Sequence, residues 1–127
     1  MLASLDFIEQ GLNVCVLGPS DSGKSYLAKA LGISACSKYR VIYQHCERLL
    51  ESLVMLKEKD YHKYQKQLKK VCGQDLLILD DFLLHTLTDK REVKLPFEIL
   101  EKRSEMQLST FICSQREPAS WSTMILN

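Results

Sequence analysis

Short runs of consecutive apolar residues are spread along the chain, separated by longer stretches in which polar and apolar positions mix. Four runs predict buried strands, at residues 13–17, 40–44, 76–79 and 110–113. Most of their side chains are apolar at successive positions, not only at every second one. That pattern is typical of a parallel sheet with both faces covered.

Between these runs, apolar residues recur at three- and four-residue intervals, which predicts amphipathic helices. Gly11 ends the first helix, and Asp89 with Glu92 predicts the start of the last one. Pro96 predicts a kink or a break in that last helix. The alternation of strands and helices indicates an α/β fold with a parallel sheet. The residues predicted to face the core are Leu2, Leu5, Ile8, Leu27, Ala30, Leu31, Ala35, Leu49, Leu50, Leu53, Leu56, Tyr61, Tyr64, Leu68, Val71, Val93, Phe97 and Leu100.

Composition narrows the class of protein. The 127 residues are 46% hydrophobic and 26% charged, which predicts one globular domain. A net charge of +1 excludes a globally basic nucleic-acid binder but leaves room for a local basic patch. No apolar run approaches the ~20 residues of a membrane span, and residues 1–10 lack the basic segment of a signal peptide. Five cysteines without a C-x-x-C pair predict buried free thiols in a cytoplasmic protein.

Residues 18–25 match the phosphate-loop pattern G-x-x-x-x-G-K-[ST] and stand between a predicted strand and a predicted helix. Glycines let backbone N–H groups surround phosphates, and the following helix adds its N-terminal dipole. Lys24 would neutralise the β- and γ-phosphates, and the Ser25 hydroxyl would bind Mg²⁺. An ordinary glycine-rich turn has no need for Lys-Ser after the second glycine. The candidate nucleotide-binding residues are Gly18, Pro19, Ser20, Asp21, Ser22, Gly23, Lys24, Ser25 and Tyr26.

Two further signals follow predicted strands. Asp80 and Asp81 end the run at residues 76–79, which places carboxylates at the sheet edge where open α/β folds bind ligands. Asp80 would hold Mg²⁺ and Asp81 would act as the general base toward water. Gln115 follows the last strand and is our candidate for sensing the γ-phosphate, with Ser114 as second choice. Alternatively, the two aspartates after a strand form a simple turn, and the polar residue after the last strand is a solvated strand end.

Taken together, these segments resemble the core of AAA+ ATPases and, within it, the IstB/DnaC-like family of transposition helpers and helicase loaders. The resemblance covers residues 2–121 and rests on the phosphate loop, the segments at residues 2–9, 75–82 and 109–115, and Trp121. It implies a P-loop NTPase fold, a three-layer sandwich with a parallel sheet of about four strands. It also implies ATP and Mg²⁺ as cofactors, Lys24, Asp81 and Gln115 as catalytic residues, and a transposase or replicative helicase as partner.

The chain departs from the family pattern at several positions. Asp21 stands where the loop usually has a glycine, and Leu83 where a glycine often follows the acidic pair. Family members continue into a fifth strand, an arginine that reaches a neighbour's nucleotide, and a C-terminal lid arginine. We therefore expect residues 1–127 to be a single truncated AAA+ domain without the fifth strand and the lid. The strand at residues 13–17 would then have an open edge, which favours homo-oligomers.

Residues 57–70 hold six lysines interleaved with two tyrosines. One interpretation is a solvated helix face with the tyrosines packed inward. The other is a sequence-independent, salt-sensitive contact with the DNA backbone. The lysines in question are Lys57, Lys59, Lys63, Lys66, Lys69 and Lys70.

The sequence leaves three functions open. The first is an ATP-binding AAA+ module that assists DNA transposition or helicase loading, with hydrolysis that is weak or absent in this chain alone. The second is a degenerate remnant that no longer hydrolyses ATP and acts as an interaction module; Asp21 and Pro96 motivate it. The third is a small-molecule kinase, which the paired Asp80 and Asp81 and the lack of an arginine-rich lid disfavour.

Overall fold

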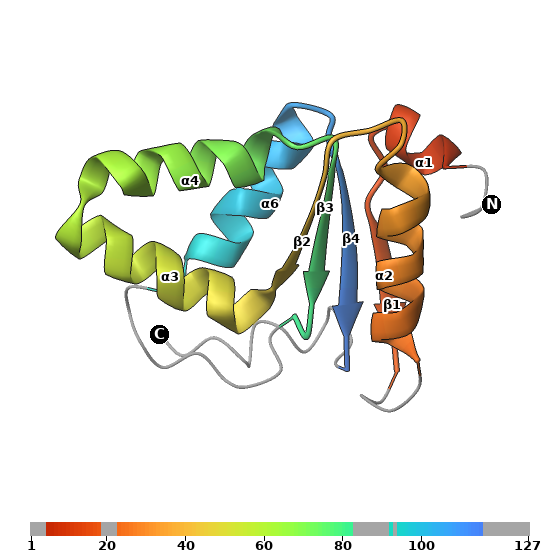
Figure 1. The fold of residues 1–127 in the computed structure, drawn as a ribbon, viewed down its shortest axis with the longest axis horizontal. Helices are drawn as coiled ribbons and strands as arrows, with labels where there is room; N and C mark the ends of the chain where they lie inside the picture. Colours follow the sequence, from red (N-terminus) through yellow and green to blue (C-terminus); the bar gives the residue numbers. More distant parts are fainter. Residues whose placement is uncertain (1–4, 19–22, 83–91, 93, 116–127) are drawn as a thin grey trace.

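Four parallel strands form one sheet in the order β1-β4-β3-β2 (Figure 1). The computed structural model describes residues 5–18, 23–82, 92 and 94–115. The predicted α/β fold with about four parallel strands is confirmed. The strands are β1 (Val14–Leu17), β2 (Val41–His45), β3 (Leu76–Asp80) and β4 (Ser109–Ser114).

The two central strands are the apolar ones. Every residue of β3 and β4 is buried, whereas β1 and β2 at the two edges are only partly covered. In the register, Ile78 pairs with Phe111 on one side and with Tyr43 on the other. Among the described residues β1 pairs with β4 alone, so the open edge expected for this strand is present.

Helices cover both faces of the sheet, which gives three layers (Figure 1). The first face is covered by α1 and α2, and its core is built around Phe7, Leu31 and Phe111. The second face is covered by α3, α4 and α6, and its core is built around Leu50 and Leu53. The helices are α1 (Asp6–Glu9), α2 (Lys24–Ala35), α3 (Cys46–Lys59), α4 (Tyr61–Gly73) and α6 (Leu95–Glu105).

The face of α2 that packs on the sheet differs from the predicted one. Ala28, Leu31 and Ala35 are buried, while Leu27 is 40% exposed and Ala30 is exposed as well. Small residues allow this helix to lie close to the strands. A Cβ added at Gly32 would stand only 3.2 Å from the Ile78 side chain. Close approach therefore selects the small-residue face over the face with the larger apolar side chains.

The other burial predictions that the structure tests were correct, except at exposed helix ends and in the edge strand β1, where Leu17 is 45% exposed. Leu2 lies outside the described residues. The stripe of α3 is buried or partly buried as expected, and so are Tyr64 and Val71 of α4. Tyr61, however, is 55% exposed because it is the first residue of α4, at the tip of the α3–α4 hairpin. Of the five cysteines, Cys15 and Cys36 are exposed, so the prediction of buried thiols was wrong for these two.

Pro96 lies in the first turn of α6, which begins at Leu95. The non-helical Lys94 separates this helix from the helical Glu92, so the predicted break is present just before the proline. A proline in the first turn removes no intrahelical hydrogen bond, because the first N–H groups of a helix have no partner in it. Phe97 and Leu100 pack against the core as predicted. Asp89 and Val93 lie outside the described residues.

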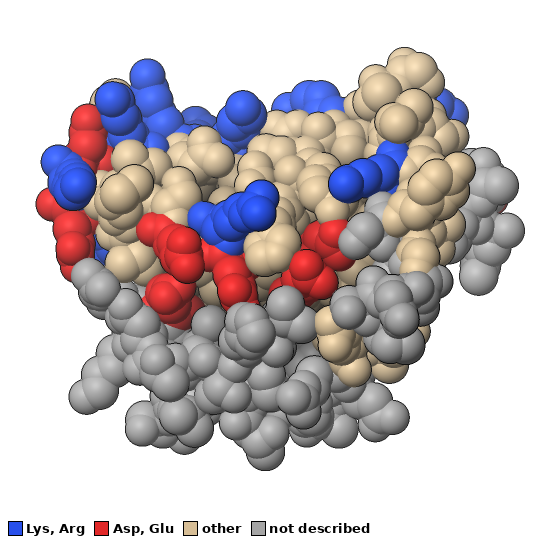
Figure 2. Space-filling view, turned by 60° about the horizontal axis from the view of Figure 1, so that its bottom comes forward, with Lys and Arg blue, Asp and Glu red and all other residues tan. Residues whose placement is uncertain are grey.

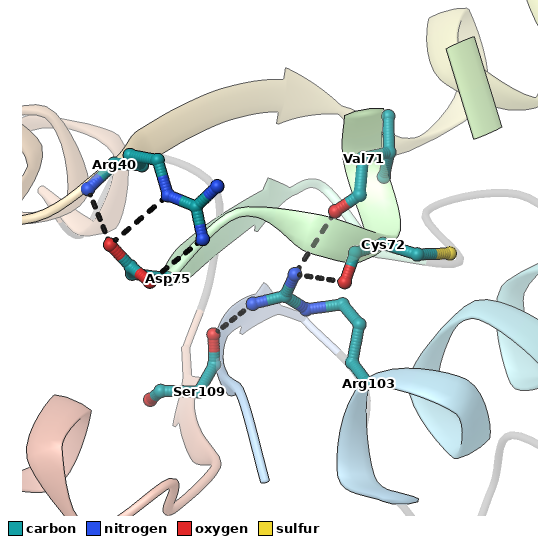
Figure 3. A network of polar contacts seen from close by, with 6 residues as sticks. All are labelled: Arg40, Val71, Cys72, Asp75, Arg103 and Ser109. Atoms are coloured by element: carbon teal, nitrogen blue, oxygen red, sulfur yellow. Dashed lines mark hydrogen bonds and ion pairs between the residues drawn. The ribbon is translucent and has the colours of Figure 1, made fainter. Parts of the chain in front are cut away.

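A buried arginine joins three elements at the end of the sheet where the strands begin (Figure 3). Arg103 of α6 is fully buried. Its guanidinium donates to the Val71 and Cys72 carbonyls in the last turn of α4, at 3.0 and 3.1 Å. It also donates to the Ser109 carbonyl at 2.6 Å and to the Thr110 hydroxyl at 2.9 Å. A cation at these carbonyls caps the C-terminus of α4.

Candidate functional site

The carboxyl ends of three strands are held together by backbone hydrogen bonds. The N–H of Gly18, just after β1, donates to the Ser114 carbonyl at 3.2 Å. The N–H of Phe82, just after β3, donates to the Cys113 carbonyl at 2.9 Å. The segment that leaves β1 and the segment that leaves β3 are thus both fixed to the end of β4. The candidate phosphate loop and the candidate acidic pair therefore share one edge of the sheet.

The phosphate-loop pattern ends in a glycine that needs its conformational freedom. Gly23 has φ +87°, in the left-handed region, and precedes the first residue of α2. Its carbonyl accepts the first helical hydrogen bond, from the N–H of Leu27 at 3.0 Å. As a glycine it has no side chain to cap the first N–H groups of α2. The start of α2 therefore presents backbone donors and a positive dipole end beside the loop.

Most of the predicted nucleotide-binding residues fall outside what the structure describes. Pro19, Ser20, Asp21 and Ser22 lie outside the described residues, and so do the side chains of Lys24 and Ser25. Their proposed contacts with phosphate and Mg²⁺ stay predictions. Tyr26 is described and is 81% exposed.

Asp80, the predicted Mg²⁺ ligand, ends β3 and is only 3% exposed. The hydroxyl of Tyr43 donates to its Oδ2 atom. The N–H of Asp81 donates to its Oδ1 atom at 3.0 Å. Burying a carboxylate is costly unless hydrogen bonds compensate it, and these two contacts provide that compensation. They also fix the orientation of the carboxylate at the sheet edge.

Asp81, the predicted general base, has φ +52°, an uncommon conformation for a residue with a side chain. Its Oδ2 atom lies 3.1 Å from Nε2 of His45, and both side chains are about one-quarter exposed. His45 is the last residue of β2 and pairs in register with Asp80. The Nδ1 atom of this histidine is buried and has no hydrogen-bond partner among the described residues.

The residues after β4 differ in how they are placed. Ser114 is fully buried, and its hydroxyl donates to the Phe82 carbonyl at 3.2 Å. Gln115 is exposed and lies at the bend that follows the strand. The structure therefore ties Ser114 into the frame of the edge and leaves the Gln115 side chain open to solvent. A γ-phosphate contact by Gln115 stays a prediction.

Sequence reasoning missed the contribution of β2. Tyr43 and His45 contact the two aspartates, and the Lys29 ammonium of α2 lies 5.7 Å from the Tyr43 ring centroid. Neither β2 residue belongs to a motif. The one available signal was register, because the ends of neighbouring parallel strands lie side by side. Without the strand order, that signal could not be used.

The six lysines predicted as a DNA contact are all exposed, but they do not lie with the acidic pair. Helix α4 leads into the amino end of β3, whereas Asp80 ends that strand. Lys57, at the end of α3, has its ammonium 5.6 Å from the Tyr64 ring centroid. Figure 2 shows acidic side chains gathered in a band across this face, with lysine and arginine side chains along the upper rim and also directly against the band.

The arrangement suits an anionic ligand held together with a hard cation. The buried carboxylate of Asp80, at the edge of the sheet where the strands end, offers the oxygen ligand that Mg²⁺ prefers. In the described part of the chain, no three His, Cys, Asp or Glu side chains gather as a metal cluster. A cation at Asp80 would therefore need further oxygens from the loop hydroxyl, the ligand and water. None of the described helices combines the length and apolar character required to cross a bilayer.

Comparison with known proteins identifies the family to which the sequence is similar. The family described as IstB-like ATP binding protein matches residues 1–127. An ATP-binding protein of insertion sequence IS21 from Pseudomonas aeruginosa is 34% identical over 97% of this chain and 45% of its own length. The insertion-sequence ATP-binding protein y4pL from Sinorhizobium fredii is 40% identical over 96% of this chain and 49% of its own. The chain thus spans about half the length of these curated relatives.

Two solved structures with the same fold belong to replication proteins. The replication initiator DnaA, bound to AMPPCP and single-stranded DNA, superposes with a TM-score of 0.79 at 22% identity. The match covers 93% of this chain and 37% of that one. The DnaC helicase loader superposes with a TM-score of 0.76 at 24% identity, over 95% of this chain and 72% of that one. These likenesses show the fold, a four-stranded parallel α/β sheet of the kind found in the AAA+ domains of DnaA and DnaC.

Proposed function

This chain belongs to the family of IstB-like ATP-binding proteins, and we propose that it binds Mg·ATP between β1 and α2 as the nucleotide-dependent part of a DNA transposition machinery. The observation that carries the proposal is the shared edge. Gly18, where the loop leaves β1, and Phe82, two residues after the buried Asp80, both donate their backbone N–H groups to carbonyls at the end of β4. The insertion-sequence names of the relatives support transposition as the process.

The chain's own residues have distinct roles in this proposal. Backbone N–H groups of the loop and of the first turn of α2 receive the phosphates, and Lys24 neutralises their charge. Ser25 and Asp80 would hold Mg²⁺, which when bound offsets the negative charge of the triphosphate. Tyr43 is a positioning residue, because its hydroxyl fixes the carboxylate of Asp80 from the neighbouring strand.

Hydrolysis asks more of the site than binding does. Asp81 would have to accept a proton from the attacking water, yet its Oδ2 atom now faces the His45 imidazole at 3.1 Å. That contact must be given up or shared before the carboxylate can act. Gln115, exposed at the same edge, is available to orient the γ-phosphate. We therefore expect ATP binding to be readily measurable and turnover by this chain to be slow.

Isothermal titration with Mg·ATP separates this function from that of an interaction module without nucleotide. We expect micromolar binding to the full chain and no measurable binding to Lys24→Ala. Lys63→Ala is the matched control, because it removes an exposed lysine of α4, away from this edge of the sheet. Absence of binding up to millimolar Mg·ATP, or equal binding by Lys24→Ala, would contradict the proposal.

A further inference from the structure

A basic groove lies at the edge of the sheet where the strands begin, opposite the acidic pair. It has a volume of about 690 Å³ and is formed by the last turns of α4, the end of α6 and the residue before β2. None of the described residues that line it is acidic. Its cationic residues, which we call the groove cations, are Arg40, Lys66, Lys69, Lys70 and Lys102.

The groove cations come from parts of the sequence that are far apart. Lys66, Lys69 and Lys70 follow one another within a turn of α4, so they lie on neighbouring positions of its surface. Lys102 comes from α6 and Arg40 from the segment before β2. All five side chains are exposed. Charges that converge from three elements create a stronger local potential than a stripe on one helix.

The frame beneath the groove is held by two groups of polar contacts, one around Arg103 and one between Arg40 and Asp75 (Figure 3). Arg103 fastens the last turn of α4 to the beginning of β4. Arg40 is held by Asp75, which accepts its backbone N–H at 2.8 Å and its guanidinium at 3.3 Å. These hydrogen bonds keep the pKa of the Asp75 carboxyl below its usual value. The groove is thus formed by helix ends that are held in place, and the nearby carboxylate of Asp75 is paired with Arg40.

We propose that this groove binds the phosphate backbone of a nucleic acid, with Lys66, Lys69, Lys70 and Lys102 as the contacts. A row of cations without acids suits a ligand of uniform negative charge, and nucleic acids are such ligands. An acidic peptide fits less well, because the groove is made mainly of helix surface, which offers no strand edge for its backbone. The proposal goes beyond nucleotide binding, and it rests on the proposed function, a part in DNA transposition, for the choice of DNA as partner.

Only three of the six lysines in residues 57–70 line the groove. Lys57, Lys59 and Lys63 lie around the tip of the α3–α4 hairpin and do not line the groove. Lys102 was not part of the lysine run at all, yet it completes the groove from α6. Because the groove and the acidic pair lie at opposite ends of β3, DNA and nucleotide can be bound at the same time.

Binding of fluorescein-labelled 20-mer DNA, single-stranded and duplex, tests the proposal by anisotropy between 50 and 200 mM salt. Replacing the four contact lysines by Gln should weaken binding by about tenfold or more at the lowest salt. It should also reduce the slope of log K against log salt by about 2.8 to 3.6, since each of the four phosphate contacts contributes about 0.7 to 0.9. The matched control replaces Lys57, Lys59, Lys63 and Lys94 by Gln, the same charge change away from the groove.

A single charge reversal gives the sharper test. Lys102→Glu should weaken DNA binding several-fold and lower the salt slope by about 1 or more, while Lys94→Glu, at the other end of the same helix, should have little effect. Equal weakening by the groove and control variants would overturn the proposal. So would displacement of DNA by polyglutamate at equal charge concentration.

Mg·ATP titration of the same variants keeps this proposal separate from the proposed function. The groove variant should bind Mg·ATP as the wild type does, and Lys24→Ala should bind DNA as the wild type does without nucleotide. If the groove variant binds DNA as well as the control variant does while the wild type binds Mg·ATP, the groove proposal is refuted and the nucleotide site is not. If the wild type does not bind Mg·ATP while the groove variant still binds DNA more weakly than the control variant, the nucleotide site is refuted and the groove proposal is not.

Discussion

Replacing Arg103 by Met tests how much one buried cation contributes to the fold. Arg103→Met keeps a similar length of chain and removes the guanidinium with its four hydrogen bonds. The backbone carbonyls of Val71, Cys72 and Ser109 cannot be removed with it, so they would lose a buried donor. Each orphaned group costs about 1–3 kcal/mol.

The cost is partly offset by the penalty that the cation itself carries. Burial lowers the pKa of the Arg103 guanidinium to about 10, which records the unfavourable desolvation of its charge. Removing the charge relieves that penalty. Three orphaned carbonyls cost about 3–9 kcal/mol together, and after the relieved desolvation is subtracted we expect a net loss of about 3–5 kcal/mol in the free energy of unfolding. That is a large share of the 5–15 kcal/mol typical of a domain.

Urea denaturation followed by circular dichroism measures the effect. For an m value near 2 kcal/mol/M, the loss corresponds to a fall of about 2 M in the midpoint. The urea midpoint of Arg103→Lys should lie between those of the wild type and Arg103→Met, because one ammonium cannot reach carbonyls on both α4 and β4. Arg48→Met, on the exposed side of α3, is the control and should stay within about 0.5 kcal/mol of wild type. Equal midpoints for the Arg103 and Arg48 variants would refute the reasoning.

Three further changes have direct readouts. Tyr43→Phe should lower the free energy of unfolding by about 1.5–3 kcal/mol in urea titrations, because a buried carboxylate loses its hydroxyl donor; an unchanged midpoint would contradict this contact. Gly11→Ala should cost about 1–3 kcal/mol, since φ is +66° and the new Cβ would collide with the Gln107 carbonyl oxygen. Gly73→Ala, where a Cβ meets nothing within 4 Å, should be neutral or stabilising, and an equal loss at both glycines would argue against the steric explanation. The pKa of Asp75 is lowered in the folded state, so its contribution to the free energy of unfolding is present above about pH 4 and is lost as the pH falls further. This contribution is below about 1 kcal/mol for so exposed a pair. Asp75→Asn should therefore make the free energy of unfolding depend less on pH below about pH 4, and a pH profile identical to that of the wild type would contradict this.

The elements of this fold could be predicted because their signals are local. Continuous apolar runs such as residues 76–79 have few alternatives to a buried strand, and the phosphate-loop pattern places a turn before α2. The face of α2 could not be predicted in the same way. Leu27 is a stronger hydrophobic signal than Ala28, yet the sheet accepts the smaller side chain because the helix lies close to it.

The parts that escaped prediction depend on contacts between distant segments. Arg103 stands in a polar stretch beside Lys102, and nothing in the sequence distinguishes the buried cation from the exposed one. Tyr43 and His45 join the candidate site only through the register of β2 with β3. The basic groove likewise depends on the way α4 and α6 end side by side. Sequence patterns give the acidic pair and the loop, while packing supplies the residues that surround them.

The location of the metal–nucleotide complex is the most direct test of the central claim. Mn²⁺ can replace Mg²⁺ in the complex with ATP, and its unpaired electrons broaden the amide resonances of nearby residues. We predict that Mn·ATP broadens the backbone amides of Gly18, Gly23 and Asp81 in the full chain and leaves those of Gly73 and Met106, at the groove, sharp. Broadening confined to the groove residues, or none at saturating Mn·ATP, would contradict a nucleotide site between β1 and α2.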